Sequence, residues 1–167
     1  MTTIPHALDA YVQDYAWHES CFAPRLQILQ ALTPCGRTAS GIGQTRPQAY
    51  DRCFAEVAEI LAPRLAGGAQ ALGFDPRRDG IAAHPDAKTA RLSALIESHE
   101  RQAVSAWWQG QRPAQPIADD WLASTGVAAQ VAADRTGSAQ KRPCQFWLLA
   151  AQGGLQVVVC RSTSQHG

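Results

Sequence analysis

The 167-residue sequence has few charges and lacks the patterns of several protein classes. Only 17% of positions are charged and the net charge is +1, so the basic surface that binds a nucleic-acid backbone is not predicted. No segment approaches the roughly 18 consecutive apolar residues of a membrane helix. The N-terminus lacks the basic and apolar regions of a secretory signal. We therefore expect a cytoplasmic protein that binds neither nucleic acid nor membrane.

The cysteines lack a pattern as well. A disulfide framework or a zinc site needs paired or closely spaced cysteines. The sequence has an odd number of them, widely spaced and without a CxxC pair: Cys21, Cys35, Cys53, Cys144 and Cys160. We predict that they are reduced core thiols.

The hydrophobic content of 46% is sufficient for one domain over residues 1–167 to bury a core. Helices and strands are expected to alternate unevenly, which predicts the α+β class. Helices are predicted over 3–17, 23–33, 47–61 and 87–108, and an ambiguous helix over 120–133. Residues 34–45 are predicted as strand or loop, and 63–80 as a turn region with one short strand around 69–74. Residues 109–120 and 134–143 are predicted as loops, and 144–161 as a β-hairpin around Gln-Gly-Gly.

Thr45 is predicted to be the N-cap of the helix over 47–61. Five apolar residues recur there at helical spacing and form a predicted buried stripe: Tyr50, Cys53, Phe54, Val57 and Leu61. Glu56 and Glu59 lie off this stripe.

The helix after Asp86, its predicted cap, carries charges in the middle of its length. On a helical wheel one face is apolar and is predicted to be buried: Leu92, Leu95, Ile96, His99, Ala103 and Trp107. The adjoining face holds Glu97, Glu100, Arg101, Val104 and Trp108.

Two interpretations of these charges stay open. Glu97 and Arg101 can form a weak i,i+4 ion pair on an exposed surface. Alternatively, Glu97 and Glu100 bind a hard cation and Arg101 binds a phosphate. Glu56 and Glu59 repeat the ExxE spacing, and two such pairs facing a common space could hold Mg²⁺ against the phosphates of a nucleotide.

Two stretches carry a resemblance to a known family. They are "ASGIGQTRPQAYDRCFAEVAEI", residues 39–60, and "DGIAAHPDAKTARLSALIESHERQAVSAWW", residues 79–108. The sequence resembles the YcaO family, in which a GKG-type stretch precedes a helix with ExxER and an NGLAAG-type stretch precedes a helix reading like ELIERDAxxxWW. The resemblance spans about residues 40–162 and is strongest over 40–108.

The resemblance implies an ATP- and Mg²⁺-dependent enzyme that modifies the backbone of a ribosomally made peptide. It implies a YcaO-like fold of mixed helices packed on β-sheet with a C-terminal β-hairpin, shorter at its C-terminus than is usual in the family. Glu56, Glu59, Glu97 and Glu100 would hold Mg²⁺ and nucleotide, with Arg101 near phosphate. The reaction implied is the formation of an azoline or a thioamide.

Three positions differ from the family's motifs. Ile42 stands in place of the lysine of GKG, Ile60 in place of the arginine of ExxER, and Asp79 in place of the asparagine of NGLAAG. The alternative is therefore a non-catalytic YcaO-like subunit that binds a precursor peptide or a partner enzyme. In either case we expect a homo- or hetero-oligomer with a partner biosynthetic protein or a second YcaO-like chain.

Overall fold

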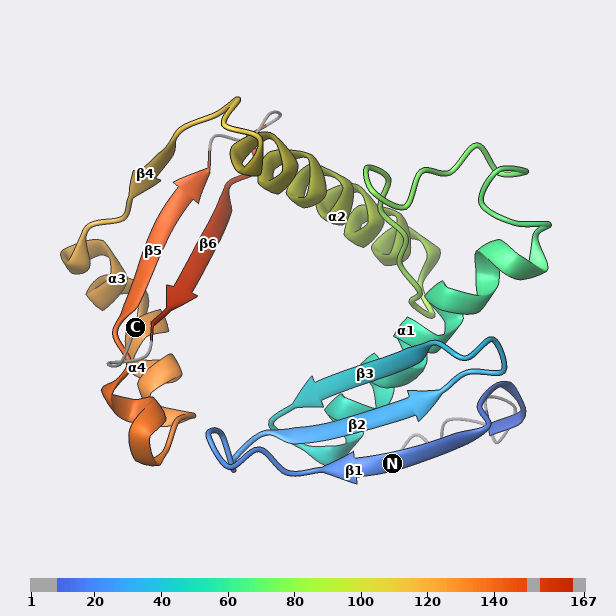
Figure 1. Cartoon of the computed structure of the whole chain (residues 1–167), viewed down its shortest axis with the longest axis horizontal. Coiled ribbons are helices and arrows are strands. Elements are labelled where there is room, and N and C mark those ends of the chain that lie inside the picture. Colours follow the sequence, from blue (N-terminus) through green and yellow to red (C-terminus); the bar gives the residue numbers. More distant parts are fainter. Residues whose placement is uncertain (1–8, 150–153, 164–167) are drawn as a thin grey trace. The chain divides into compact units, whose positions relative to one another are not determined.

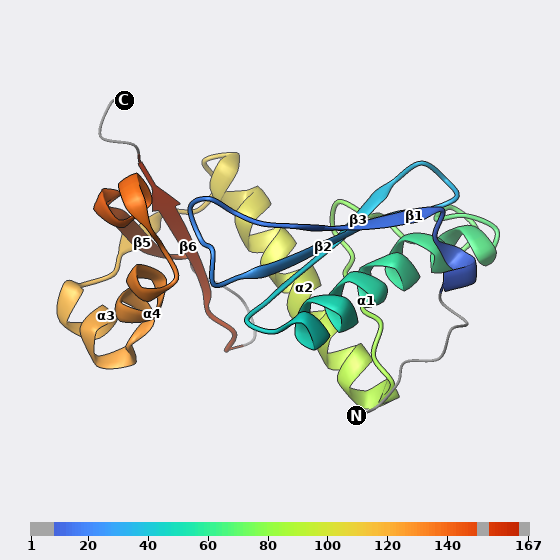
Figure 2. The ribbon, with the colours of Figure 1, turned by 90° about the horizontal axis from the view of Figure 1, so that it is seen from below.

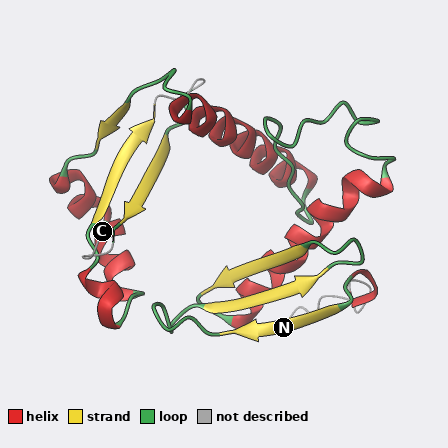
Figure 3. Ribbon diagram, in the orientation of Figure 1, coloured by secondary structure: helices red, strands yellow, loops and turns green. Residues whose placement is uncertain are grey.

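The computed structural model describes residues 9–149 and 154–163 (Figures 1 and 3). These residues form two compact units, each with a three-stranded antiparallel sheet. The first unit comprises residues 9–20, 24–75 and 82–90, and the second comprises 21–23, 76–81, 91–149 and 154–163. The mixture of helices and antiparallel sheets agrees with the predicted α+β class. No helix in the described part of the chain is long and apolar enough to cross a membrane.

The sheet of the first unit contains β1 (Asp14–His18), β2 (Gln27–Leu32) and β3 (Thr38–Gly43), in the order β1-β2-β3. The helix predicted over 23–33 is therefore wrong, and so is the described part of the helix predicted over 3–17. That part holds a 3₁₀ turn, Asp9–Tyr11, and then β1. In β2, Leu29 and Ala31 are buried while Gln30 and Leu32 are exposed. This alternation with period two is typical of a half-buried strand.

Helix α1 (Arg46–Leu65) lies along one face of this sheet (Figure 2). It extends the predicted helix at both ends, and the predicted cap is confirmed because Thr45 Oγ1 accepts a hydrogen bond from the amide of Gln48 at 3.4 Å. The predicted stripe builds the core, although Tyr50 and Leu61 are only partly buried. The buried members of this core are Leu29, Ala31, Ala39, Cys53, Phe54, Val57 and Ile60.

Two glycines of β3 let α1 approach the strand. A Cβ atom added at Gly41 would lie 2.0 Å from the carbonyl oxygen of Ala49, and one added at Gly43 would lie 2.8 Å from the Ala49 nitrogen. Any larger residue would push the helix off the sheet. The glycines of "GIG" are therefore required by packing.

Helix α2 (Ala87–Trp108) begins in the first unit and continues in the second. Its predicted cap is confirmed because Asp86 accepts a hydrogen bond from the Thr89 amide at 2.7 Å. The predicted buried face is confirmed only in part, because Ala103 is buried and His99 and Trp107 are half-buried. Leu92, Leu95 and Ile96 are 58%, 59% and 43% exposed, and Ala103 is the only residue of the helix that is fully buried. The half-buried face instead includes Glu97 and Arg101.

The sheet of the second unit contains β4 (Ala114–Pro116), β5 (Cys144–Leu149) and β6 (Val157–Ser162), in the order β4-β5-β6. The predicted hairpin is confirmed, with Phe146 opposite Cys160, while residues 150–153 of its turn lie outside the described residues. The loop predicted over 109–120 contains β4. The ambiguous helix is two helices, α3 (Asp119–Thr125) and α4 (Val127–Ala133), separated by Gly126 with φ of 71°.

The cysteines are free thiols. Cys53 is buried, but the prediction of a core position is wrong for Cys21 and Cys160, which are exposed. The short strand predicted over 69–74 is also wrong, because these residues form turns. The region 134–143 contains a 3₁₀ turn, Gly137–Lys141, whose Ala139 is buried.

Candidate functional site

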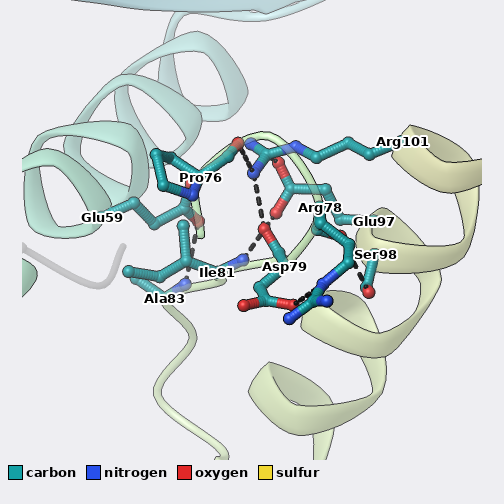
Figure 4. A network of polar contacts seen from close by, with 9 residues as sticks. All are labelled: Glu59, Pro76, Arg78, Asp79, Ile81, Ala83, Glu97, Ser98 and Arg101. Atoms are coloured by element: carbon teal, nitrogen blue, oxygen red, sulfur yellow. Dashed lines mark hydrogen bonds and ion pairs between the residues drawn. The ribbon is translucent and has the colours of Figure 1, made fainter. Parts of the chain in front are cut away.

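The irregular segment 76–83 makes most of the polar contacts around the predicted site residues (Figure 4). A segment outside regular secondary structure has no ladder to satisfy its backbone groups, so these groups need other partners. In this protein the partners are side chains of helices. Residues 76–81 contact α2 within the second unit, and Ala83 contacts α1 within the first.

Gly80 brings the segment directly onto α2. A Cβ atom at this position would lie 1.9 Å from the carbonyl oxygen of Ala94, a distance at which no side chain fits. The close approach places the next amide over the helix, and Ile81 donates a hydrogen bond to Glu97 Oε2 at 2.7 Å. The Glu97 carboxylate is thus oriented by a backbone group of the segment that precedes its helix.

Arg101 ties the same segment to α2. Its Nη1 donates to the carbonyl oxygens of Pro76 at 2.8 Å and Asp79 at 2.6 Å, and its Nη2 pairs with Glu97 Oε1 at 2.5 Å. The side chains of Glu97 and Arg101 are each 32% exposed. The predicted i,i+4 ion pair therefore exists, but it is part of a half-buried network and not an isolated surface contact.

Two further contacts complete the network. The Ser98 hydroxyl donates to the Arg78 carbonyl oxygen at 3.0 Å, and the Arg78 guanidinium pairs with the Asp79 carboxylate at 3.2 Å. The carbonyls of Pro76, Arg78 and Asp79 are thus all bound by side chains of α2.

The glutamates of α1 also accept backbone amides. Glu59 Oε1 accepts the Ala83 amide at 2.9 Å, and Glu56 Oε2 accepts the Ser40 amide at 2.6 Å. Ser40 lies on the edge strand β3, where an unpaired amide needs a partner. Three of the four predicted glutamates therefore share one feature, a carboxylate held by a backbone N–H group.

Glu56 also affects a neighbouring thiol. Burial raises the pKa of Cys53 to about 11, and the negative charge of Glu56 contributes in the same direction. A thiol with such a pKa remains protonated at neutral pH and is a poor nucleophile. Cys53 is therefore a core residue of the first unit.

Glu100 differs from the other three glutamates. Its side chain is exposed, and within residues 9–149 and 154–163 no hydrogen-bond partner contacts it. The same residues contain no cluster of three or more His, Cys, Asp and Glu side chains arranged to hold a metal ion. Glu56 and Glu59 belong to the first unit, and Glu97 and Glu100 to the second. Their binding of one common cation stays a prediction.

The donor chemistry of these residues fits Mg²⁺, which prefers a few carboxylate oxygens combined with phosphate oxygens. A carboxylate has about four acceptor positions, so one amide hydrogen bond leaves capacity for a cation. Backbone donors behind a ligating carboxylate are a usual means of orienting it. The phosphate contact that the resemblance implies for Arg101 stays a prediction.

The three positions that differ from the family's motifs have distinct surroundings. Ile42 is 45% exposed, and its carbonyl oxygen accepts a hydrogen bond from Arg52 at 2.5 Å. Ile60 is 8% exposed and belongs to the core. The Asp79 carbonyl is bound by Arg101. An arginine in place of Ile60 would therefore have to leave the core or disrupt it.

The sequence did not reveal the roles of Gly80, Ser98 and the amides of Ser40, Ile81 and Ala83. A backbone amide carries no side-chain signal, so its donor role cannot be predicted from the residue type. Gly80 was the one available clue, because a glycine after aspartate indicates either a turn or a close approach of the backbone.

Residues 74–167 match one protein-family model, described as YcaO cyclodehydratase, ATP- and Mg²⁺-binding. The match covers more than half of the chain and includes the segment 76–83, α2 and the second sheet. Glu97, Glu100 and Arg101 lie inside the matched region, whereas Glu56 and Glu59 precede it. Comparisons with curated proteins and with solved structures give no significant match.

Proposed function

The chain belongs to the YcaO family, and from this premise we propose that it takes part in ATP- and Mg²⁺-dependent activation of a backbone amide in a ribosomally made peptide. The observation that carries the proposal is the orientation of Glu97 by the Ile81 amide, inside the region that matches the family. The product would be an azoline or a thioamide, and the protein would act in the cytoplasm.

The chemistry explains the need for a nucleotide. A Cys, Ser or Thr side chain, or an external sulfide, adds to the amide carbon, and the former carbonyl oxygen must then depart. This oxygen is a poor leaving group, and ATP with Mg²⁺ would supply the phosphoryl group that makes it a good one. The oxygen leaves as phosphate.

The chain's own contribution would be to hold the cation. Glu97 and Glu59 would present carboxylate oxygens whose direction is set by the Ile81 and Ala83 amides. Glu56 is oriented in the same manner by Ser40, and the exposed Glu100 would reorient on binding. An oriented carboxylate loses less entropy on binding than a free one, which favours affinity.

A test is co-expression with neighbouring biosynthetic proteins and a candidate peptide, followed by mass measurement. Loss of one water per azoline, or exchange of one oxygen for sulfur, is expected. Glu97→Gln should abolish the mass change. Glu19→Gln, which alters an exposed glutamate outside these contacts, is the matched control. Modification that persists with Glu97→Gln would contradict the proposal.

The second candidate function is that of a non-catalytic subunit that binds the precursor peptide or a partner enzyme. The supporting observation is the pair of isoleucines at the family's cationic positions, one of them in the core. For the purified chain alone we expect weak or undetectable Mg-ATP binding, because the side chains of Ile42 and Ile60 cannot form charge-assisted hydrogen bonds with phosphate. A partner chain would then supply the cationic side chains that contact phosphate, in a homo- or hetero-oligomer.

Calorimetry separates the two candidates. Tight, Mg²⁺-dependent ATP binding by the purified chain would support a complete site within this protein. ATP binding that appears only after addition of a partner chain would support a shared site. Peptide binding that is independent of nucleotide in every combination would support the non-catalytic subunit.

A further inference from the structure

The guanidinium of Arg101 is engaged within the protein. Both hydrogens of Nη1 are directed to carbonyl oxygens of the segment 76–81, and Nη2 contacts Glu97. A planar guanidinium presents its donors in a fixed fork, and here this fork matches three acceptors at once. A lysine has no such geometry, since its ammonium group is a compact charge on a flexible stem.

These contacts act on Glu97 by two routes. The first is the direct ion pair with Glu97 Oε1. The second passes through the backbone, because the segment held by Arg101 at Pro76 and Asp79 donates the Ile81 amide to Glu97 Oε2. Both oxygens of one carboxylate are therefore oriented by groups that depend on Arg101 (Figure 4).

We infer that Arg101 is a positioning residue, which holds the segment 76–81 on α2 and thereby fixes the Glu97 carboxylate for a divalent cation. The cation-binding part rests on the proposed function, whereas the effect on the segment does not. The competing role is a direct contact of Arg101 with phosphate. The two roles predict different results without nucleotide. A positioning role requires Arg101 for holding the segment 76–81 and for cation binding, whereas a phosphate contact requires it for neither.

The test compares Arg101→Lys and Arg101→Met in the full chain, with Arg91→Met as control, since Arg91 is exposed on the same helix. Two readouts are used: hydrogen exchange of the Ile81 amide by NMR, and Mn²⁺ binding without nucleotide. In both Arg101 variants we expect Ile81 exchange to accelerate by about tenfold or more and Mn²⁺ affinity to fall. Methionine has no donor, and the ammonium group of lysine lacks the planar geometry with which the guanidinium contacts its three acceptors. Arg91→Met should change neither.

The inference is overturned if Arg101→Lys keeps both the Ile81 protection and the Mn²⁺ affinity of the wild-type protein while ATP binding weakens. Absence of Mn²⁺ binding by the wild-type protein would contradict a cation site formed by this chain alone, and Ile81 exchange would still decide the role of Arg101 in holding the segment. If Arg101→Met fails to fold, Arg101→Lys remains decisive. Ser98→Ala removes the contact with Arg78 and the hydrogen bond that Gln102 donates to the Ser98 hydroxyl, but it leaves the contacts of Arg101 in place. This variant should then show a smaller acceleration in the same direction.

Discussion

The two helices with the ExxE spacing are held in place by different forces. Helix α1 places Cys53, Phe54 and Val57 in a buried core on the face that meets the sheet. Helix α2 leaves Leu92, Leu95 and Ile96 exposed, and the segment 76–81 reaches it through a glycine contact and four hydrogen bonds. Hydrophobic burial thus positions Glu56 and Glu59, whereas polar contacts position Glu97.

This difference has a consequence for function. A hydrophobic core tolerates loss of one polar contact, but a polar network in which one arginine serves three acceptors does not. The backbone segment, and with it the amide that orients Glu97, should therefore respond to single substitutions that leave α1 unaffected.

The largest effect on stability is expected from truncation of the core under α1. Phe54 is 2% exposed, and Phe54→Ala should lower the free energy of unfolding by about 3–5 kcal/mol through lost burial and a cavity. The matched change on the other helix is Leu95→Ala, at a position 59% exposed, for which we expect a change below about 1 kcal/mol. Urea denaturation measures both. Equal effects would contradict the comparison.

The two glycine contacts give a second pair. Gly41→Ala and Gly80→Ala each place a methyl group on a helix backbone, at a cost of about 1–3 kcal/mol or more. For Gly41→Ala we expect the loss to appear in global unfolding, because the contact lies against the core helix. For Gly80→Ala we expect a local release of the segment, with faster exchange of the Ile81 amide and unchanged exchange in β2.

NMR-detected hydrogen exchange distinguishes these outcomes. Uniform acceleration of exchange in both units with Gly80→Ala would show that the segment is part of a global core. This result would remove the contrast between the two helices.

The third prediction separates binding from stability. Glu97→Gln combined with Glu100→Gln should change the free energy of unfolding by no more than about 1 kcal/mol, since the amide oxygen of glutamine can still accept the Ile81 N–H and Glu100 is exposed. Mg²⁺-dependent nucleotide binding, measured in the assembly that is active, should fall by more than about tenfold. Unfolding of the double variant with unchanged modification per folded molecule would identify the glutamates as structural.

The sequence predictions were more accurate for α1, which a hydrophobic core holds in place, than for α2, which polar contacts hold. The helix over 47–61 and its cap were predicted correctly, because its apolar residues follow one period and meet one core. The buried face of α2 was predicted only in part, since the same period in Leu92, Leu95 and Ile96 does not lead to burial in the described structure. The helix predicted over 23–33 failed because "QILQAL" is short enough to satisfy both periods, and pairing with β1 and β3 decided for the strand.

The candidate site was predicted as residue types but not as contacts. Glu97 and Arg101 were selected from their spacing and from the family resemblance, and their ion pair is present. The other hydrogen-bond partners of this pair, which orient both side chains, are backbone groups of residues 76–81. They lie more than a dozen residues earlier in the chain, and no local sequence pattern predicts these contacts.

The smallest expected effect concerns how each helix begins. Helix α1 is capped by Thr45, which does not titrate, whereas α2 is capped by Asp86. Hydrogen bonds from the Thr89 side chain and then the Thr89 amide hold the pKa of Asp86 below its ordinary value. A depressed pKa in the folded state means that the stabilisation is present above the ordinary pKa of aspartate, near pH 4, and is lost as the pH falls through the lower folded value.

Acid should therefore fray the first turn of α2 but not that of α1. The measurement is hydrogen exchange of the Thr89 and Gln48 amides between about pH 2 and pH 6, corrected for the intrinsic pH dependence of exchange, with loss of protection expected at Thr89 alone. Asp86→Asn is the matched control, because asparagine caps a helix without titrating and should remove the pH dependence while keeping the cap. Parallel loss of protection at both amides would mean that acid acts on the whole first unit. In that case the start of α2 would depend on the core that holds α1, and the division between a core-held and a polar-held helix would not extend to their N-termini.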